Sequence, residues 1–110
     1  MPVYLVRMDH PDGAGWGEHV RAHILYLQRL IQEGKLLASG PLRNTPLRSG
    51  FLIMKGDTVQ QIEEMVANDP FAVQGLICAL RIEEWDPLFG CLSDHATGEL
   101  PPELAAGVSL

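Results

Sequence analysis

His23 is the residue whose type and position point most directly to chemistry. An imidazole titrates at about pH 6.5, so burial or a nearby carboxylate can tune it as a proton shuttle. His23 stands in an amphipathic segment, at a position that should face the protein interior. The alternative is a histidine at the edge of the core, whose ring is satisfied by a backbone carbonyl.

Asp69 is the candidate partner of His23, although 46 positions separate them. A carboxylate beside an imidazole fixes its tautomer and raises its basicity, which is the logic of a catalytic His–Asp pair. The structural alternative is that Asp69, which precedes Pro70, caps the next helical turn with its own side chain. Proximity in three dimensions decides whether the pair exists.

A second group of candidates would contact a substrate. Ser39, Gly40 and Pro41 could place a hydroxyl and a closely approaching backbone at the mouth of a cavity. The chain has no GxSxG motif, so Ser39 is expected to donate a hydrogen bond and not to act as a nucleophile. Arg21 and Arg43 could hold an anionic substrate, or could be ordinary solvated surface residues.

The four histidines also raise the question of a metal. His19 and His23 have the i, i+4 spacing that can chelate a metal from one helix face, and His10 and His95 could be added. However, successive positions four apart differ by about 40° around a helix, and no HExxH motif accompanies them. We therefore expect no metal and no cofactor.

Composition limits the remaining classes of function. The chain has 110 residues, which predicts one domain, and a net charge of −6 with scattered arginines, which disfavours nucleic acid as a partner. No apolar run approaches the roughly 20 residues that span a bilayer, and no signal peptide is recognisable, so no membrane partner is expected. Cys78 and Cys91 lack ligand spacing, which favours free thiols and a cytoplasmic location.

Hydrophobic periodicity predicts the elements that position the candidates. The first helix should cover residues 17–33, with Gly34 as its C-cap, and a second helix should begin near Thr58 and end before Pro70. Four strands are expected at residues 3–8, 35–39, 50–55 and 76–85, with Gly40 and Pro41 ending the second strand. The apolar stripe of the first helix should face the sheet, whereas Gln28 should face solvent; the stripe comprises Val20, Ile24, Leu27 and Ile31.

The order βαββαβ predicts a ferredoxin-like α+β fold, in which both helices cover one face of an antiparallel sheet. Residues 1–88 would form this domain, and residues 89–110 a partly ordered C-terminal tail. Phe51 and Ile53 alternate with Leu52 and Met54, so both faces of the third strand are apolar. Because a monomer does not leave a large apolar sheet face in water, a homodimer through the open face is expected.

Several short motifs resemble the YciI-like (YCII-related) family over roughly residues 3–88. They are the His23 helix, the strand that runs from Gly34 to Pro41, Gly50, the Asn68–Phe71 corner with Gly75 and Leu76, and the closing strand with Trp85. The resemblance implies a dimeric α/β barrel of the ferredoxin-like type, with a His and an Asp in its cavity. Carried over to this sequence, these residues are His23 and Asp69. Some relatives instead carry acidic residues near the end of the first helix, where this chain has Gln32 and Glu33.

The resemblance also implies a function. Some members look like enzymes of aromatic-compound breakdown, including a dehydrochlorinase, and the wider superfamily includes muconolactone isomerases. The leading hypothesis is cofactor-independent proton transfer on a small organic acid, lactone or phenol, by isomerisation or elimination. His23 would be the general acid/base and Asp69 would orient it. The alternatives are a non-catalytic small-molecule-binding or interaction module, and a cofactor-free monooxygenase of the related barrel type.

Overall fold

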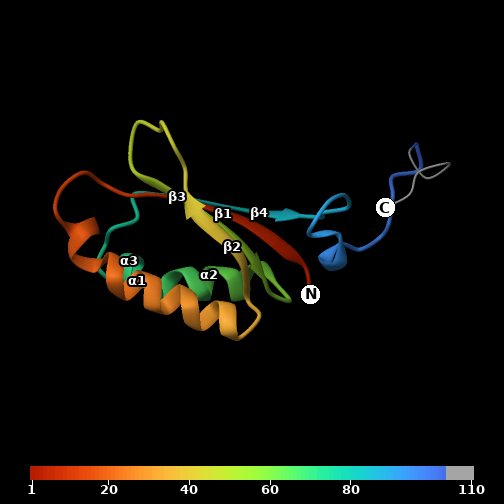
Figure 1. Cartoon of the computed structure of the whole chain (residues 1–110), viewed down its shortest axis with the longest axis horizontal. Coiled ribbons are helices and arrows are strands. Elements are labelled where there is room, and N and C mark those ends of the chain that lie inside the picture. Colours follow the sequence, from red (N-terminus) through yellow and green to blue (C-terminus); the bar gives the residue numbers. More distant parts are fainter. Residues whose placement is uncertain (104–110) are drawn as a thin grey trace.

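The computed structural model describes residues 1–103. Four strands form one antiparallel sheet in the order β2-β3-β1-β4, and the helices lie on one side of it (Figure 1). The predicted ferredoxin-like α+β fold is therefore confirmed. The elements are β1 (Val3–Asp9), α1 (Gly15–Gln32), β2 (Leu36–Pro41), β3 (Ser49–Lys55), α2 (Val59–Ala67), α3 (Pro70–Val73) and β4 (Ala79–Trp85).

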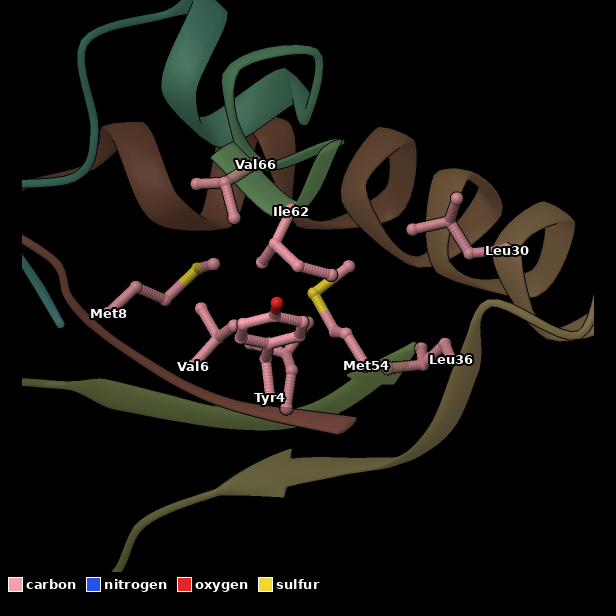
Figure 2. Close-up of a cluster of buried hydrophobic side chains, with 9 residues drawn as sticks. Tyr4, Val6, Met8, Leu30, Leu36, Met54, Ile62 and Val66 are labelled. Carbon is pink, nitrogen blue, oxygen red and sulfur yellow. The ribbon is translucent and has the colours of Figure 1, made fainter. Parts of the chain in front are cut away.

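The hydrophobic core lies between the sheet and the helices (Figure 2). Alternation along β1 turns Tyr4, Val6 and Met8 inward, and antiparallel register pairs Tyr4 with Met54 and Val6 with Leu52 on the same face. From the helical layer, α2 contributes Ile62, which is fully buried. This packing fixes the sheet beneath α1 and α2.

Within residues 1–103, the opposite face of the sheet carries no helix (Figure 1). Leu5 is paired with Ile53, and Arg7 with Phe51, so these four side chains share the outer face. All four are only partly buried in the single chain. The expected open, largely apolar face is thus present in the sheet.

Two predicted strand boundaries differ from the structure by more than one residue. Strand β2 continues through Gly40 and Pro41, because β2 is an edge strand and a proline without an N–H is tolerated there. Strand β4 begins at Ala79 and not at Leu76. The N–H of Leu76 donates instead to the carbonyl of Phe71 (2.7 Å), which closes the turn after α3 before the chain reaches the sheet.

Helix α1 does not bury its apolar stripe as predicted. Ile24 and Ile31 are 47% and 55% exposed, and Leu30 is the buried residue of the helix. The stripe lines a cavity between α1 and the sheet, and Gln28, which was expected to face solvent, lines it too. The periodicity identified the correct face of the helix, but that face meets open space in place of side chains.

The segment after β4 folds back on itself as far as the structure describes it. Asp86 accepts hydrogen bonds from the backbone N–H (2.9 Å) and the hydroxyl (2.6 Å) of Thr97, and a short 3₁₀ helix covers Ser93–His95. Residues 104–110 of the predicted tail lie outside the described part. In residues 1–103, no helix is long and apolar enough to cross a membrane.

Candidate active site

A cavity of about 520 Å³ lies between α1, the inner face of the sheet and the loop that joins β2 to β3. Its walls are mostly apolar, and its polar groups come from separate segments of the chain. No Asp or Glu lines it, although the chain has 14 acidic residues. The polar or aromatic lining residues are His10, Trp16, His23, Gln28, Ser39, Arg48, Ser49 and Phe71.

The structure brings His23 and Asp69 together at this cavity. Nδ1 of His23 lies 2.8 Å from Oδ2 and 2.9 Å from Oδ1 of Asp69. Since an ionised carboxylate only accepts hydrogen bonds, Nδ1 carries a hydrogen, and in the neutral imidazole the lone pair is then on Nε2. The side chain of Asp69 is 2% exposed and that of His23 is 14% exposed. The imidazole therefore separates the buried carboxylate from the cavity.

The local sequence explains why Asp69 is fixed at this place. Asn68 ends α2, and Pro70 opens α3 at a position where its missing N–H costs nothing. Asp69 is the N-cap of α3, and its Oδ1 accepts the backbone N–H of Phe71 at 2.9 Å. The capping role and the contact with His23 are thus both present, and one carboxylate serves them together.

Phe71 is a buried ring against which other rings of the site lie. The centroid of His23 is 4.3 Å from that of Phe71 with an interplanar angle of 26°, and the centroid of His10 is 4.6 Å away at 54°. Trp16 lies at 6.0 Å and 23°. Phe71 is 1% exposed, so its ring can keep both imidazoles in place while it touches the cavity.

Arg48 and Trp16 are two lining residues of the cavity that contact each other. The guanidinium carbon of Arg48 lies 3.8 Å from the centroid of the Trp16 ring, a cation–π contact. Arg48 belongs to the loop between β2 and β3, and it forms no ion pair with the residues that the structure describes. A guanidinium held against a ring with free N–H groups is suited to an anionic oxygen.

The other candidates fall into two groups. Ser39, Gly40 and Pro41 line the cavity, whereas Arg21 and Arg43 are exposed and do not line it. Glu33 lies in surface ion pairs with Arg29 (3.8 Å) and Lys35 (3.9 Å) and not beside His23. Sequence reasoning missed Arg48 and considered His10 only as a metal ligand; the sole signal for Arg48 was its place in the loop before β3.

Two carboxylates near the site are involved in pKa shifts: the pKa of Asp9 is itself shifted, and Asp69 shifts the pKa of a tyrosine. The hydroxyl of Ser49 donates to Asp9 Oδ1 (2.6 Å), and this hydrogen bond lowers the pKa of Asp9, helped by Arg7 and by the charge of His10. On the other side of α1, burial and then the negative charge of Asp69 raise the pKa of Tyr26. The hydroxyl of Tyr26 donates to the carbonyl of Met65 at 2.7 Å.

No group of three or more His, Cys, Asp or Glu side chains is placed to hold a metal ion within residues 1–103. His23 uses Nδ1 for Asp69, and His10 uses Nδ1 for the carbonyl of Leu76 (2.7 Å). Each of these two imidazoles therefore has its Nδ1 engaged in a hydrogen bond within the protein.

The fold and the cavity together define an α+β protein of the ferredoxin-like type, with an imidazole–carboxylate pair at a largely apolar cavity. The chain belongs to the YCII-related domain family, which matches residues 1–86. This confirms the resemblance drawn from the sequence motifs. A search of the curated proteins finds no match.

Several solved structures are similar to this chain, among them the following two. One is the 5-chloro-2-hydroxyhydroquinone dehydrochlorinase TftG of Burkholderia phenoliruptrix AC1100 in complex with 2,5-dihydroxybenzoquinone, at 26% identity and a TM-score of 0.67 over 76% of this chain and 93% of that one. The other is protein Atu4242 of Agrobacterium tumefaciens, at 13% identity and a TM-score of 0.48 over 79% and 93%. The likeness to the first extends over almost its whole length, whereas the second is too distant to support an argument.

Proposed function

We propose that this protein is a cofactor-independent enzyme that catalyses proton transfer on a small organic acid, lactone or phenol, by isomerisation or by elimination such as dehydrochlorination. His23 is the general acid/base and Asp69 orients it. The observation that carries the proposal is the 2.8 Å contact between His23 Nδ1 and the buried Asp69 carboxylate at the wall of a cavity. It supports a tautomer in which the Nε2 lone pair is available to a bound molecule.

The chemistry begins when His23 Nε2 takes a proton from an activated C–H or O–H bond of the substrate. The bonding electron pair moves into the conjugated π system of the substrate, and Asp69 stabilises the imidazolium. In an isomerisation a proton is returned to a different atom, so the composition does not change. In an elimination the electron pair expels a leaving group as its anion, and His23 later releases the proton to water.

The cavity suits a planar, electron-rich molecule. Trp16 offers aromatic surface, and the 520 Å³ volume accommodates a single substituted ring. Arg48 is positioned to pair with a carboxylate or phenolate oxygen, and the lining contains no acidic side chain that would repel it. Ser39, with the neighbouring Gly40 and Pro41, supplies a further polar contact at the edge strand.

Similarity to TftG supports the same class of reaction. That protein is a dehydrochlorinase of a chlorinated hydroquinone, and its structure holds a planar dihydroxyquinone. Identity of 26% over most of both chains supports a related reaction for this protein.

We further propose that the protein acts as a cytoplasmic homodimer. Leu5, Phe51 and Ile53 form an apolar outer sheet face, which a second copy would remove from water. The cysteines Cys78 and Cys91 are both free thiols, as is usual in a reducing compartment.

The test uses the purified full chain with 5-chloro-2-hydroxyhydroquinone and with a muconolactone, under anaerobic conditions, following chloride release and lactone isomerisation. We expect turnover by the wild type, and a loss of about 10² to 10⁴-fold for His23→Gln. Arg21→Gln, a change at an exposed residue outside the cavity, is the matched control and should keep full activity. Unchanged turnover by a folded His23→Gln variant would refute the assignment. Tight binding of both compounds without turnover would favour a binding module.

A further inference from the structure

His10 is a second imidazole at the cavity, and the mechanism above leaves it without a role. It follows directly after β1 and is 3% exposed. Its backbone N–H donates to the carbonyl of Arg48 (2.8 Å), and its Nδ1 lies 2.7 Å from the carbonyl oxygen of Leu76. A carbonyl oxygen only accepts, so Nδ1 must carry a hydrogen.

The orientation of His10 leaves Nε2 as its free nitrogen. Within residues 1–103 no side-chain hydrogen bond is made by Nε2, and no buried side-chain nitrogen or oxygen lacks a partner, so this atom is accessible from the cavity that His10 lines. Position 50 is a glycine, and a Cβ there would lie 4.0 Å from Nε2. The absence of a side chain at Gly50 therefore keeps space beside the free nitrogen.

The two imidazoles have matching arrangements around one ring. The centroids of His10 and His23 lie 4.6 Å and 4.3 Å from that of Phe71, so the two rings are separated by no more than the sum of these distances. Each ring uses Nδ1 for a fixed acceptor, and both rings line the same cavity. Two imidazoles that line one cavity at such a separation can both contact the same bound ring.

We propose that His10 is a second catalytic residue, which delivers from Nε2 the proton that the substrate gains while His23 removes the proton that the substrate loses. This inference rests on the proposed function and assigns the second half of its proton transfer. It makes the site a two-imidazole acid–base pair for a hydroxylated aromatic ring.

The different partners of the two rings assign the direction of transfer. The imidazolium that forms on His23 is stabilised by the Asp69 carboxylate, so His23 is the better proton acceptor. The partner of His10 is a neutral carbonyl and not a carboxylate, so His10 is assigned the proton that the substrate gains.

The reaction balances for a chlorinated hydroquinone. A hydroxyl proton of the substrate passes to His23 Nε2, and the oxygen that loses it forms a C=O bond. An electron pair of the ring then takes the proton from His10 Nε2, so that the carbon that carries chlorine gains a C–H bond. Loss of a second hydroxyl proton to water then forms the second C=O bond, and chloride leaves with the C–Cl electron pair, giving a quinone. His23 returns its proton to water and His10 regains one. The net change is loss of HCl.

The structural alternative is that His10 only ties β1 to Leu76 and to Arg48. His10→Asn separates the two roles, because the side-chain amide of Asn can still donate to the Leu76 carbonyl but has no atom at the place of Nε2. Gly50→Ala is the complementary change, since it leaves His10 intact and puts a methyl group beside Nε2 at ordinary van der Waals distance.

The experiment measures exchange of ring hydrogens of 2-hydroxyhydroquinone, which carries no leaving group, in D₂O under anaerobic conditions, together with chloride release from its 5-chloro derivative. We expect His10→Asn to fold, to bind both compounds, and to lose about 10²-fold or more of both rates, with partial rescue by added imidazole. Gly50→Ala should slow both rates less.

The outcomes separate this inference from the proposed function. Full exchange and full chloride release by His10→Asn would overturn the role of His10 alone. Full activity of His23→Gln, or no exchange and no turnover by the wild type, would overturn the proposed function and the His10 role with it. If His10→Asn does not fold, Gly50→Ala is tested in its place. Unchanged rates of hydrogen exchange and chloride release in Gly50→Ala would count against the inference.

Discussion

Nδ1 of His23 lies between the two oxygens of Asp69, at 2.8 and 2.9 Å, while one of those oxygens also accepts the N–H of Phe71. The carboxylate therefore joins α1 to the start of α3 and fixes the tautomer of the imidazole. Phe71, the residue that Asp69 caps, is also the ring on which His23 stacks. Three residues from two distant segments thus hold one another in place, and their structural and chemical roles can be tested separately.

Substitutions at Asp69 should distinguish the cap from the orienting role. Asn can still accept the N–H of Phe71, so Asp69→Asn should fold, but its amide cannot serve as a charged acceptor for His23 Nδ1. We expect a loss of turnover of about 10² to 10⁴-fold. Asp69→Ala should lose as much activity and, in addition, about 0.5–2 kcal/mol of unfolding free energy through the lost cap.

Urea unfolding and steady-state turnover measure the two effects side by side. Asp57→Asn, in the exposed turn before α2, is the matched control and should change neither quantity. Wild-type turnover in Asp69→Asn would leave Asp69 as a helix cap only.

Tyr26 should report the charge of Asp69. Burial raises the pKa of Tyr26 above its ordinary value of about 10, and the Asp69 carboxylate raises it further. Ultraviolet titration of the phenolate should therefore show Tyr26 ionising above pH 10, and Asp69→Asn should move this pKa down towards the ordinary value. The chain has two tyrosines, and Tyr26→Phe identifies the signal of the second, Tyr4.

The same shift makes stability depend on alkaline pH. The folded state holds the Tyr26 proton more tightly than the unfolded state, so this contribution is complete below the unfolded pKa and is lost as pH rises through the folded one. Unfolding by urea at a series of alkaline pH values should show a smaller loss for Tyr26→Phe than for the wild type. An equal loss in both proteins would contradict the assignment.

Ser49 should control the acid side of the stability profile. Its hydroxyl is the main reason that the pKa of Asp9 is lowered, so Ser49→Ala should raise this pKa, as carboxyl NMR titration would measure. Because the folded pKa is below the unfolded one, the contribution is present above the unfolded pKa of about 3.9 and is lost as pH falls through the folded pKa.

Urea midpoints of wild type and Ser49→Ala should therefore differ at neutral pH and converge in acid. Ser93→Ala is the control, since the hydroxyl of Ser93 makes no hydrogen bond to Asp9 within residues 1–103. A difference between wild type and Ser49→Ala that persists at the lowest pH would show that Ser49 acts through packing and not through Asp9.

The sequence predicts the fold well because its signals are local. Periodicity indicated the order of strands and helices, and Gly34 does adopt the positive φ (74°) expected of a C-cap. The errors arise where tertiary context decides. Pro41 remains in a strand because β2 is at the edge of the sheet, and the stripe of α1 faces a cavity because no side chains from the sheet fill that space.

The site was only partly predictable for a related reason. His23 stood out because a titratable residue on an apolar helix face is unusual, and Asp69 because of its corner motif. Arg48 has no such local signal, since its importance comes from the place of Trp16 in the folded chain. For His10, the sequence could not show that Leu76 would orient its ring, because 66 positions separate them.

The outer sheet face yields the last prediction. Phe51 and Arg7 are register partners at its centre, and Phe51→Asp would place a carboxylate in an interface built on this face. We expect the wild type to sediment as a dimer and Phe51→Asp as a folded monomer. Leu25→Asp is the matched control, because Leu25 is a 56% exposed leucine on α1, away from the sheet face. The Leu25→Asp variant should remain a dimer. A dimer that survives Phe51→Asp but dissociates in Leu25→Asp would place the interface on the helical layer, and the apolar outer face would then need another partner.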